Sequence, residues 1–286
     1  FPVLVAGVAF SINETFDRIL LKELLPPNIA NTDIGMYSAC YKIALFMTLF
    51  ATAYRLGIEP FFFSHAKSKN PQKNYATILE FFVAFGSVIL LSVVVFADVL
   101  KPYIVRSEAY WEAMWVVPII LIANFCLGIY HNLSVWYKIT DKTKFGAYIA
   151  IGGGAITILV NMIFIPLYGF EASAWATLIV YGLQMVASYL LGQKYYPIKY
   201  NLRKFGLYFG LALGLFFIAQ IVDMDPNEFT WAKFFFHNSL ILLYVFAHNQ
   251  MIRLLLYNLH LIILIIMWNC PFLPINLILL VSFILF

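Results

Sequence analysis

The chain has 286 residues, of which 63% are hydrophobic and 11% charged, and its formal net charge is +4. Soluble domains carry about 25% charged residues, whereas the mean hydropathy of this chain is +0.87. Too few polar residues are present to cover a soluble globule, so the composition excludes one and indicates a polytopic membrane protein. The cations lie in short clusters between apolar runs, a pattern that argues against nucleic-acid binding.

Eight apolar runs follow one another along the chain, each close to the ~20 residues that a membrane helix needs. They cover residues 1–21, 35–63, 76–97, 113–136, 145–166, 170–193, 205–222 and 231–252. No run alternates apolar and polar residues as the strands of a transmembrane barrel do. Backbone groups in lipid must be satisfied within their own segment, so each run is expected to be helical. The predicted fold class is all-α: a polytopic integral membrane helix bundle with about eight transmembrane helices.

The cations between the runs predict an orientation in the membrane. One side receives eleven of them: Lys67, Lys69, Lys73, Lys138, Lys142, Lys144, Lys194, Lys199, Arg203, Lys204 and Arg253. The other side receives Lys22, Lys101, Arg106 and Lys233, with Arg18 and Lys42 close to it. Cytoplasmic loops carry the excess of Lys and Arg. We therefore expect the first side, and the N-terminus with it, to be cytoplasmic.

A polar stripe runs along residues 35–66. At 100° per residue, six polar side chains fall within a narrow arc. They are Tyr37, Tyr41, Thr48, Thr52, Arg55 and Glu59. A charge near the bilayer centre costs about 2.5–3.5 kcal/mol on insertion scales, so this stripe is expected to face protein or water. Two interpretations stay open: the stripe borders a cavity, or Arg55 and Glu59 form a structural ion pair at i,i+4.

Polar positions recur on three further spans. The first ends in Glu14, Asp17 and Arg18, which form either a coupling site beside a cationic substrate contact or an interfacial Glu14–Arg18 salt bridge. The fourth span places Asn124, Gly128, His131 and Lys138 near one face, and the sixth places Ser173, Thr177, Tyr181, Gln184 and Ser188 on one face. His131 either titrates near physiological pH or serves packing. The recurrence predicts a hydrophilic cavity shared by these helices.

Two sets of candidate site residues follow from these stripes. The candidate substrate or cavity residues are Arg55, Glu59, Arg18, Tyr41, Thr52 and Gln184. The candidate ion- or proton-coupling residues are Glu14, Asp17 and His131. In the fifth span, residues 152–154 are three glycines, which permit either close helix packing or bending.

No motif of enzyme chemistry is found in the chain. A phosphate-binding loop, His-Glu-x-x-His and a nucleophile elbow are all missing, and Cys40, Cys126 and Cys270 have neither metal nor disulfide spacing. We expect no catalytic residue, no metal and no cofactor. Residues 254–286 contain no Lys, Arg, Asp or Glu, and they are interpreted as a kinked span, a re-entrant hairpin or a non-native tail.

Several short motifs carry a family resemblance. They are Asp17-Arg18, Gly35-Met36-Tyr37-Ser38, Tyr41-Lys42 and Pro60, and a longer pattern from Lys142-Thr143-Lys144 through Asn161, Ile165-Pro166, Gly169 and Ala172 to Ala176-Thr177. Together they resemble the multidrug/oligosaccharidyl-lipid/polysaccharide exporter superfamily, and within it the O-antigen and capsule flippases of the bacterial inner membrane. The resemblance covers residues 1–253. Glu171 departs from it, because these proteins usually have a second glycine there.

The resemblance implies helices seven to fourteen of a fourteen-helix transporter. Residues 1–193 would form its six-helix C-terminal lobe, residues 194–253 two additional transmembrane helices, and residues 254–286 a hydrophobic tail of uncertain status. The sequence is interpreted as N-terminally truncated, so a further six-helix lobe of the same transporter is an expected partner.

The implied substrate is an oligosaccharide on a polyprenyl diphosphate lipid, destined for lipopolysaccharide or capsule. It would cross the inner membrane by alternating access, with H+ or Na+ as the coupling ion, and membrane lipid is a further expected partner. Arg18 and Arg55 favour such an anionic headgroup, whereas Glu14, Asp17 and Glu59 leave open a multidrug or metabolite exporter of the same superfamily. A membrane enzyme of polysaccharide assembly is a further alternative, although the loops between spans are short for a catalytic domain.

Overall fold

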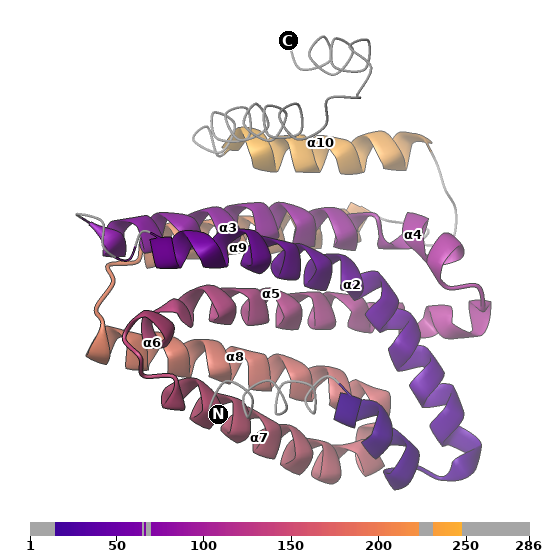
Figure 1. The fold of residues 1–286 in the computed structure, drawn as a ribbon. Helices are drawn as coiled ribbons and strands as arrows, with labels where there is room; N and C mark the ends of the chain where they lie inside the picture. Colours follow the sequence, from indigo (N-terminus) through magenta and orange to yellow (C-terminus); the bar gives the residue numbers. More distant parts are fainter. Residues whose placement is uncertain (1–14, 65, 67–69, 223–230, 248–286) are drawn as a thin grey trace, which may run out of the picture. The chain divides into compact units, whose positions relative to one another are not determined.

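The fold is taken from a computed structural model, in which residues 15–64, 66, 70–222 and 231–247 are described. Nearly all of this part is helical and no strand occurs in it, so the all-α prediction is confirmed (Figure 1). The chain forms two compact units, Phe1–Ile241 and Leu242–Phe286. The contacts discussed below all belong to the first unit.

Residues 15–24 form the end of a helix. The elements that follow are α2 (Pro27–Ser64), α3 (Pro71–Val95), α4 (Ala97–Ile104), the 3₁₀ helix η1 (Glu108–Val116), α5 (Val117–Leu133), α6 (Val135–Ile139), α7 (Lys144–Tyr168), α8 (Phe170–Tyr195), α9 (Leu202–Val222) and α10 (Trp231–Ala247).

Six helical stretches of the described chain are long and apolar enough to cross a membrane. They are Pro27–Ser64, Pro71–Val95, Glu108–Ile139, Lys144–Tyr168, Phe170–Tyr195 and Leu202–Ala219. They correspond to the second to seventh predicted spans, and they make the chain a multi-pass membrane protein. Most of the first predicted span, the end of the eighth, Glu14 and residues 254–286 lie outside the described residues.

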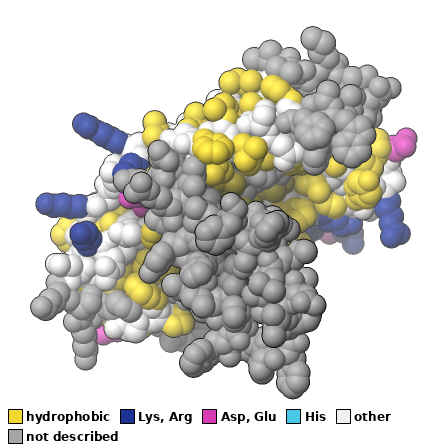
Figure 2. All heavy atoms as spheres, turned by 90° about the horizontal axis from the view of Figure 1, so that it is seen from above, with side chains coloured by type: hydrophobic (Ala, Val, Ile, Leu, Met, Phe, Trp, Pro, Cys, Tyr) yellow, Lys and Arg dark blue, Asp and Glu magenta, His cyan; other side chains and the backbone are white. Residues whose placement is uncertain are grey.

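The surface agrees with this assignment. Large apolar side chains such as Leu159, Leu167 and Leu190 are 60–70% exposed, as expected of residues that face lipid. In the face drawn in Figure 2, Lys and Arg side chains stand out at two opposite ends, and the described surface between them is largely hydrophobic.

Local sequence explains where several helices begin and end. Pro27 and Pro71 open α2 and α3, because proline suits the first helical turn, where its missing N–H is not needed. Gly169 separates α7 from α8 with a φ of +57°, a conformation that favours glycine. Asp33 of α2 accepts the N–H of Phe170 at 3.0 Å, so a side chain from another helix caps α8.

Helix α5 lies between α3 and α8 and also packs against α2 (Figure 1). Helices α2 and α5 run in the same direction. Cys40 Sγ, in the first half of α2, donates to the carbonyl of Ala113 in η1, which precedes α5. Glu59, near the end of α2, contacts Lys138 of α6, which follows α5. Helices α7 and α8 form an antiparallel pair, and α9 packs on α3.

A stack of phenylalanine rings crosses this packing. Phe50, Phe82, Phe125 and Phe209, from α2, α3, α5 and α9, lie ring on ring with centroids 5.3–5.9 Å apart and interplanar angles of 10–17°. Gly86 and Gly128 make room for it, because a Cβ on either would overlap Phe125 or Phe82. The stack therefore fixes the spacing of four membrane helices.

Candidate functional site

A buried carboxylate, Asp17, lies where four helices meet. It is 3% exposed and sits on the helical segment 15–24. Tyr37 of α2 donates to its Oδ2 at 2.8 Å, and Asn161 of α7 donates to its Oδ1 at 2.8 Å. The hydroxyl of Thr177 in α8 lies 3.1 Å from Oδ2. A buried carboxylate is tolerated only when such partners replace its hydration.

The outer members of this network orient the inner ones. Ser173 donates to Asn161 Oδ1 at 3.1 Å, which turns the amide so that its Nδ2 faces Asp17. The Thr177 hydroxyl also lies 2.8 Å from the carbonyl of Ser173, and its single proton can serve only one acceptor at a time. We call Asp17, Tyr37, Asn161, Ser173 and Thr177 the Asp17 network.

The Asp17 network offers oxygen ligands and a proton-binding group. Carboxylate, amide and hydroxyl oxygens suit hard cations, and a carboxylate can instead take up a proton. Within the described residues, no group of three or more His, Cys, Asp or Glu could hold a metal ion. The network can therefore bind a proton or a small cation through a single acid, and it lacks the acids of a divalent-metal site.

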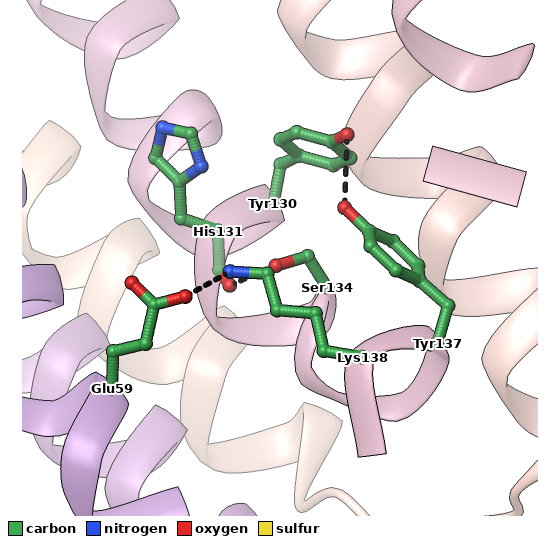
Figure 3. A network of polar contacts seen from close by, with 6 residues as sticks. All are labelled: Glu59, Tyr130, His131, Ser134, Tyr137 and Lys138. Atoms are coloured by element: carbon green, nitrogen blue, oxygen red, sulfur yellow. Dashed lines mark hydrogen bonds and ion pairs between the residues drawn. The ribbon is translucent and has the colours of Figure 1, made fainter. Parts of the chain in front are cut away.

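A second polar site joins the end of α2 to α5 and α6. Glu59 Oε1 accepts a hydrogen bond from Lys138 Nζ at 2.6 Å (Figure 3). Arg55, His131 and Asn132 line the same small cavity as this pair, together with apolar side chains. The cavity has a volume of about 10 Å³, on the order of one water molecule.

Arg55 is not the partner of Glu59 in this arrangement. No hydrogen bond or ion pair of Arg55 occurs in the described part of the chain, and its Nε is buried without an acceptor. The i,i+4 ion pair considered from the sequence is therefore wrong, because Lys138 comes from another helix and reaches Glu59 directly. Arg55 is half-buried and has no ion-pair partner in the described part of the chain.

Arg18 and Tyr41 form a third contact. The Arg18 guanidinium carbon lies 5.3 Å from the centroid of the Tyr41 ring, in cation–π geometry, and Arg18 Nε is buried without an acceptor. Since Asp17 and Arg18 are neighbours in sequence, this contact adjoins the Asp17 network. It brings together two of the candidate cavity residues.

The remaining candidates lie apart from these contacts. Thr52 is exposed on α2. Gln184 lies on α8 against Gly153 of α7, where a Cβ would overlap its amide, so the glycine permits close packing of the two helices. The structure thus places Arg55, Glu59 and His131 together, Asp17 and Arg18 together, and Gln184 elsewhere.

The sequence stripes did not identify Tyr37, Asn161 and Thr177 as partners of Asp17, nor Lys138 as the partner of Glu59. The sequence places these polar residues on the faces of their own helices, and a position on one helix does not say which helices meet. Comparison of the chain with family models, curated proteins and solved structures gave no match.

Proposed function

We propose that the chain is part of a flippase that moves polyprenyl-diphosphate-linked oligosaccharide across the bacterial inner membrane by alternating access. On this proposal it performs no covalent chemistry. The observation that carries the proposal is Arg55, a membrane-helix arginine whose nearest acid in sequence, Glu59, is bonded to Lys138.

An unneutralised arginine within a membrane bundle needs an anion. Charged residues in membrane helices face a bundle interior or a water-filled path and mark substrate routes. A guanidinium stays charged when it is desolvated and binds phosphate oxygens in bidentate fashion. A diphosphate headgroup has the charge and the geometry to occupy this position, with Arg18 as a second cation on the same helical lobe.

Transport against a gradient requires coupling, and we assign it to Asp17. The Asp17 network joins four segments of the chain, so protonation or cation binding there changes contacts on all of them at once. Such linkage between a bound ion and helix packing is what alternating access demands. His131, which lies in the cavity beside Arg55 and Lys138, is the weaker coupling candidate, because two cations adjoin it.

The exporter alternative is less well supported. A site for cationic drugs would use free acids, whereas Glu59 is bonded to Lys138 and Asp17 is enclosed by hydrogen-bond donors.

Depletion of the protein in its native cell tests the proposal. We expect lipid-linked oligosaccharide to accumulate in the inner leaflet while surface polysaccharide disappears. Unchanged surface polysaccharide after depletion would contradict the proposed substrate. Collapse of the proton gradient or the sodium gradient, each separately, identifies the coupling ion in the same assay.

A further inference from the structure

Buried polar atoms without hydrogen-bond partners gather between α2 and α5. In the described part of the chain, such atoms belong to Arg18, Thr48, Arg55, Asn124, Asn132 and Ser188. Thr48 and Arg55 lie on α2, and Asn124 and Asn132 lie on α5, which packs against it. We call these four residues the α2–α5 polar seam.

Asn124 is the most unusual member of the seam. It is 1% exposed, and neither its Nδ2 nor its Oδ1 has a partner in the described part of the chain. Folded proteins rarely leave a buried amide in this condition. Asn161 provides the contrast, because it is equally buried and both of its amide atoms are bonded, to Asp17 and to Ser173. A purely structural asparagine can therefore be satisfied in this fold.

Helix geometry predicts that Thr48 and Asn124 lie at the same level of the seam. Arg55 and His131 line one cavity, and Thr48 and Asn124 each lie seven residues before them. Seven residues are close to two helical turns, or about 10 Å of rise. Thr48 therefore lies on the same face of α2 as Arg55, and Asn124 on the same face of α5 as His131. Because α2 and α5 run in the same direction, Thr48 and Asn124 are displaced from that cavity by the same distance.

The chemistry of this level favours hydroxyl groups. An amide offers a donor and an acceptor side by side, a threonine hydroxyl is both, and carbohydrate hydroxyls match them. A cation is disfavoured, because Arg55, which has no ion-pair partner in the described part of the chain, lies about two helical turns farther along the same seam. The cavity of about 10 Å³ in the seam is lined by Arg55 and Asn132, not by Asn124. A ligand therefore reaches Asn124 only when α2 and α5 separate.

We propose that Asn124 and Thr48 form a subsite for carbohydrate hydroxyls, closed in this conformation and opened by movement of α2 away from α5. The bound group follows from the proposed function, the oligosaccharide part of a lipid-linked substrate. The unpaired amide destabilises the closed seam, and a ligand that pairs it stabilises the open one. Asn124 thus destabilises the closed conformation, in which its amide is unpaired, and binds the ligand in the open conformation.

Cysteine accessibility tests the opening directly. Asn124→Cys is compared with Ala123→Cys on a background in which Cys40, Cys126 and Cys270 are replaced. Ala123 is the matched control, since it is 0% exposed and its side chain belongs to a cluster shared with α8. We expect a methanethiosulfonate reagent to modify position 124 at least about tenfold faster than position 123. Equal rates would show that the seam does not open.

A leucine substitution separates binding from packing. Asn124→Leu removes an unpaired buried amide, so we expect the Tm of the purified protein to rise by about 2–4 °C while transport is lost. The control Asn161→Leu removes a paired amide and lowers the Tm. Normal transport by Asn124→Leu, or a lower Tm, overturns the proposal.

The class of ligand is tested in two kinds of membrane. One comes from cells that assemble polyprenyl-diphosphate oligosaccharides, the other from isogenic cells lacking the first sugar-phosphate transferase. Slower modification of Asn124→Cys in the first membrane supports a carbohydrate subsite, and equal rates overturn it. The comparison of positions 123 and 124 needs no substrate and tests only whether the seam opens. It is therefore independent of the comparison of the two membranes, which also tests the proposed substrate.

Discussion

Lys138 Nζ lies 2.6 Å from Glu59 Oε1, and this ion pair joins α6 to the end of α2 across 79 residues of sequence. It engages the acid that lies one helical turn from Arg55. Glu59 therefore links α2 to α6, and Arg55, one helical turn away, has no ion-pair partner in the described part of the chain.

A double-mutant cycle on Glu59→Gln and Lys138→Met measures the pair. Both side chains are about one-third exposed, at 35% and 30%, so we expect a coupling free energy of roughly 0.5–1 kcal/mol. The matched cycle on Arg55→Leu and Glu59→Leu should show weaker coupling, because the two side chains line one cavity without forming an ion pair. Thermal unfolding of the purified variants gives both values. Larger coupling in the Arg55 cycle would contradict the geometry.

Loss of a donor to Asp17 should destabilise the protein more than loss of an exposed hydroxyl. Tyr37→Phe removes a buried hydrogen bond to a carboxylate, which costs about 1.5–3 kcal/mol. Tyr148→Phe is the control, because Tyr148 is exposed on α7 and its change should stay within about 0.5 kcal/mol. Denaturant unfolding in detergent compares the two. Similar values for both variants would show that Tyr37 contributes nothing to the Asp17 network.

Two adjacent glycines of α7 should respond oppositely to alanine. A Cβ on Gly152 meets nothing within 4 Å, so Gly152→Ala should raise the free energy of unfolding by up to about 1 kcal/mol. A Cβ on Gly153 would overlap the Gln184 amide, so Gly153→Ala should lower it by about 1–3 kcal/mol. The same unfolding assay measures both. Equal effects would mean that α7 and α8 do not approach closely at Gly153.

The loop charges predict which end of the bundle faces the cytoplasm. Single cysteines at Lys142 and Lys199 should resist a membrane-impermeant thiol reagent in intact cells, whereas one at Arg106 should react. The native cysteines are replaced for this measurement, and permeabilised cells serve as the control. The reverse pattern of labelling would invert the orientation.

Hydropathy located the membrane helices because it records the apolar middle of each one. The span predicted at residues 35–63 is part of α2, which begins earlier, at Pro27. Its first turns contain Asn28, Asn31 and Asp33. These polar residues lower the local hydropathy, so a hydropathy profile does not detect this part of the helix. The span predicted at 113–136 likewise extends to Glu108–Ile139. The apolar parts of the helices were predictable, whereas their polar ends were not.

Periodicity could not show which polar residues meet. It placed Tyr37 and Glu59 on one stripe of α2, yet Tyr37 bonds Asp17 and Glu59 bonds Lys138. The spacing of Arg55 and Glu59 within one helix suggested a local pair, but a lysine from another helix reaches Glu59 instead. Gln184 was grouped with Thr177 by helical phase, although it lies against Gly153. Each outcome depends on helix-to-helix register, which a single helix does not encode.

Surface polysaccharide in cells that carry Arg55 variants tests the central claim most directly. Arg55→Ala should abolish surface polysaccharide at unchanged membrane abundance, because the diphosphate loses its cation. Arg55→Lys should retain part of it, since lysine keeps the charge and loses the bidentate fork. Lys73→Ala, at an exposed lysine of α3 that does not line the Arg55 cavity, is the control and should transport normally. If Arg55→Ala leaves surface polysaccharide intact, or if only its abundance falls and Arg55→Leu with Glu59→Leu restores both, Arg55 is a packing residue and the account is wrong.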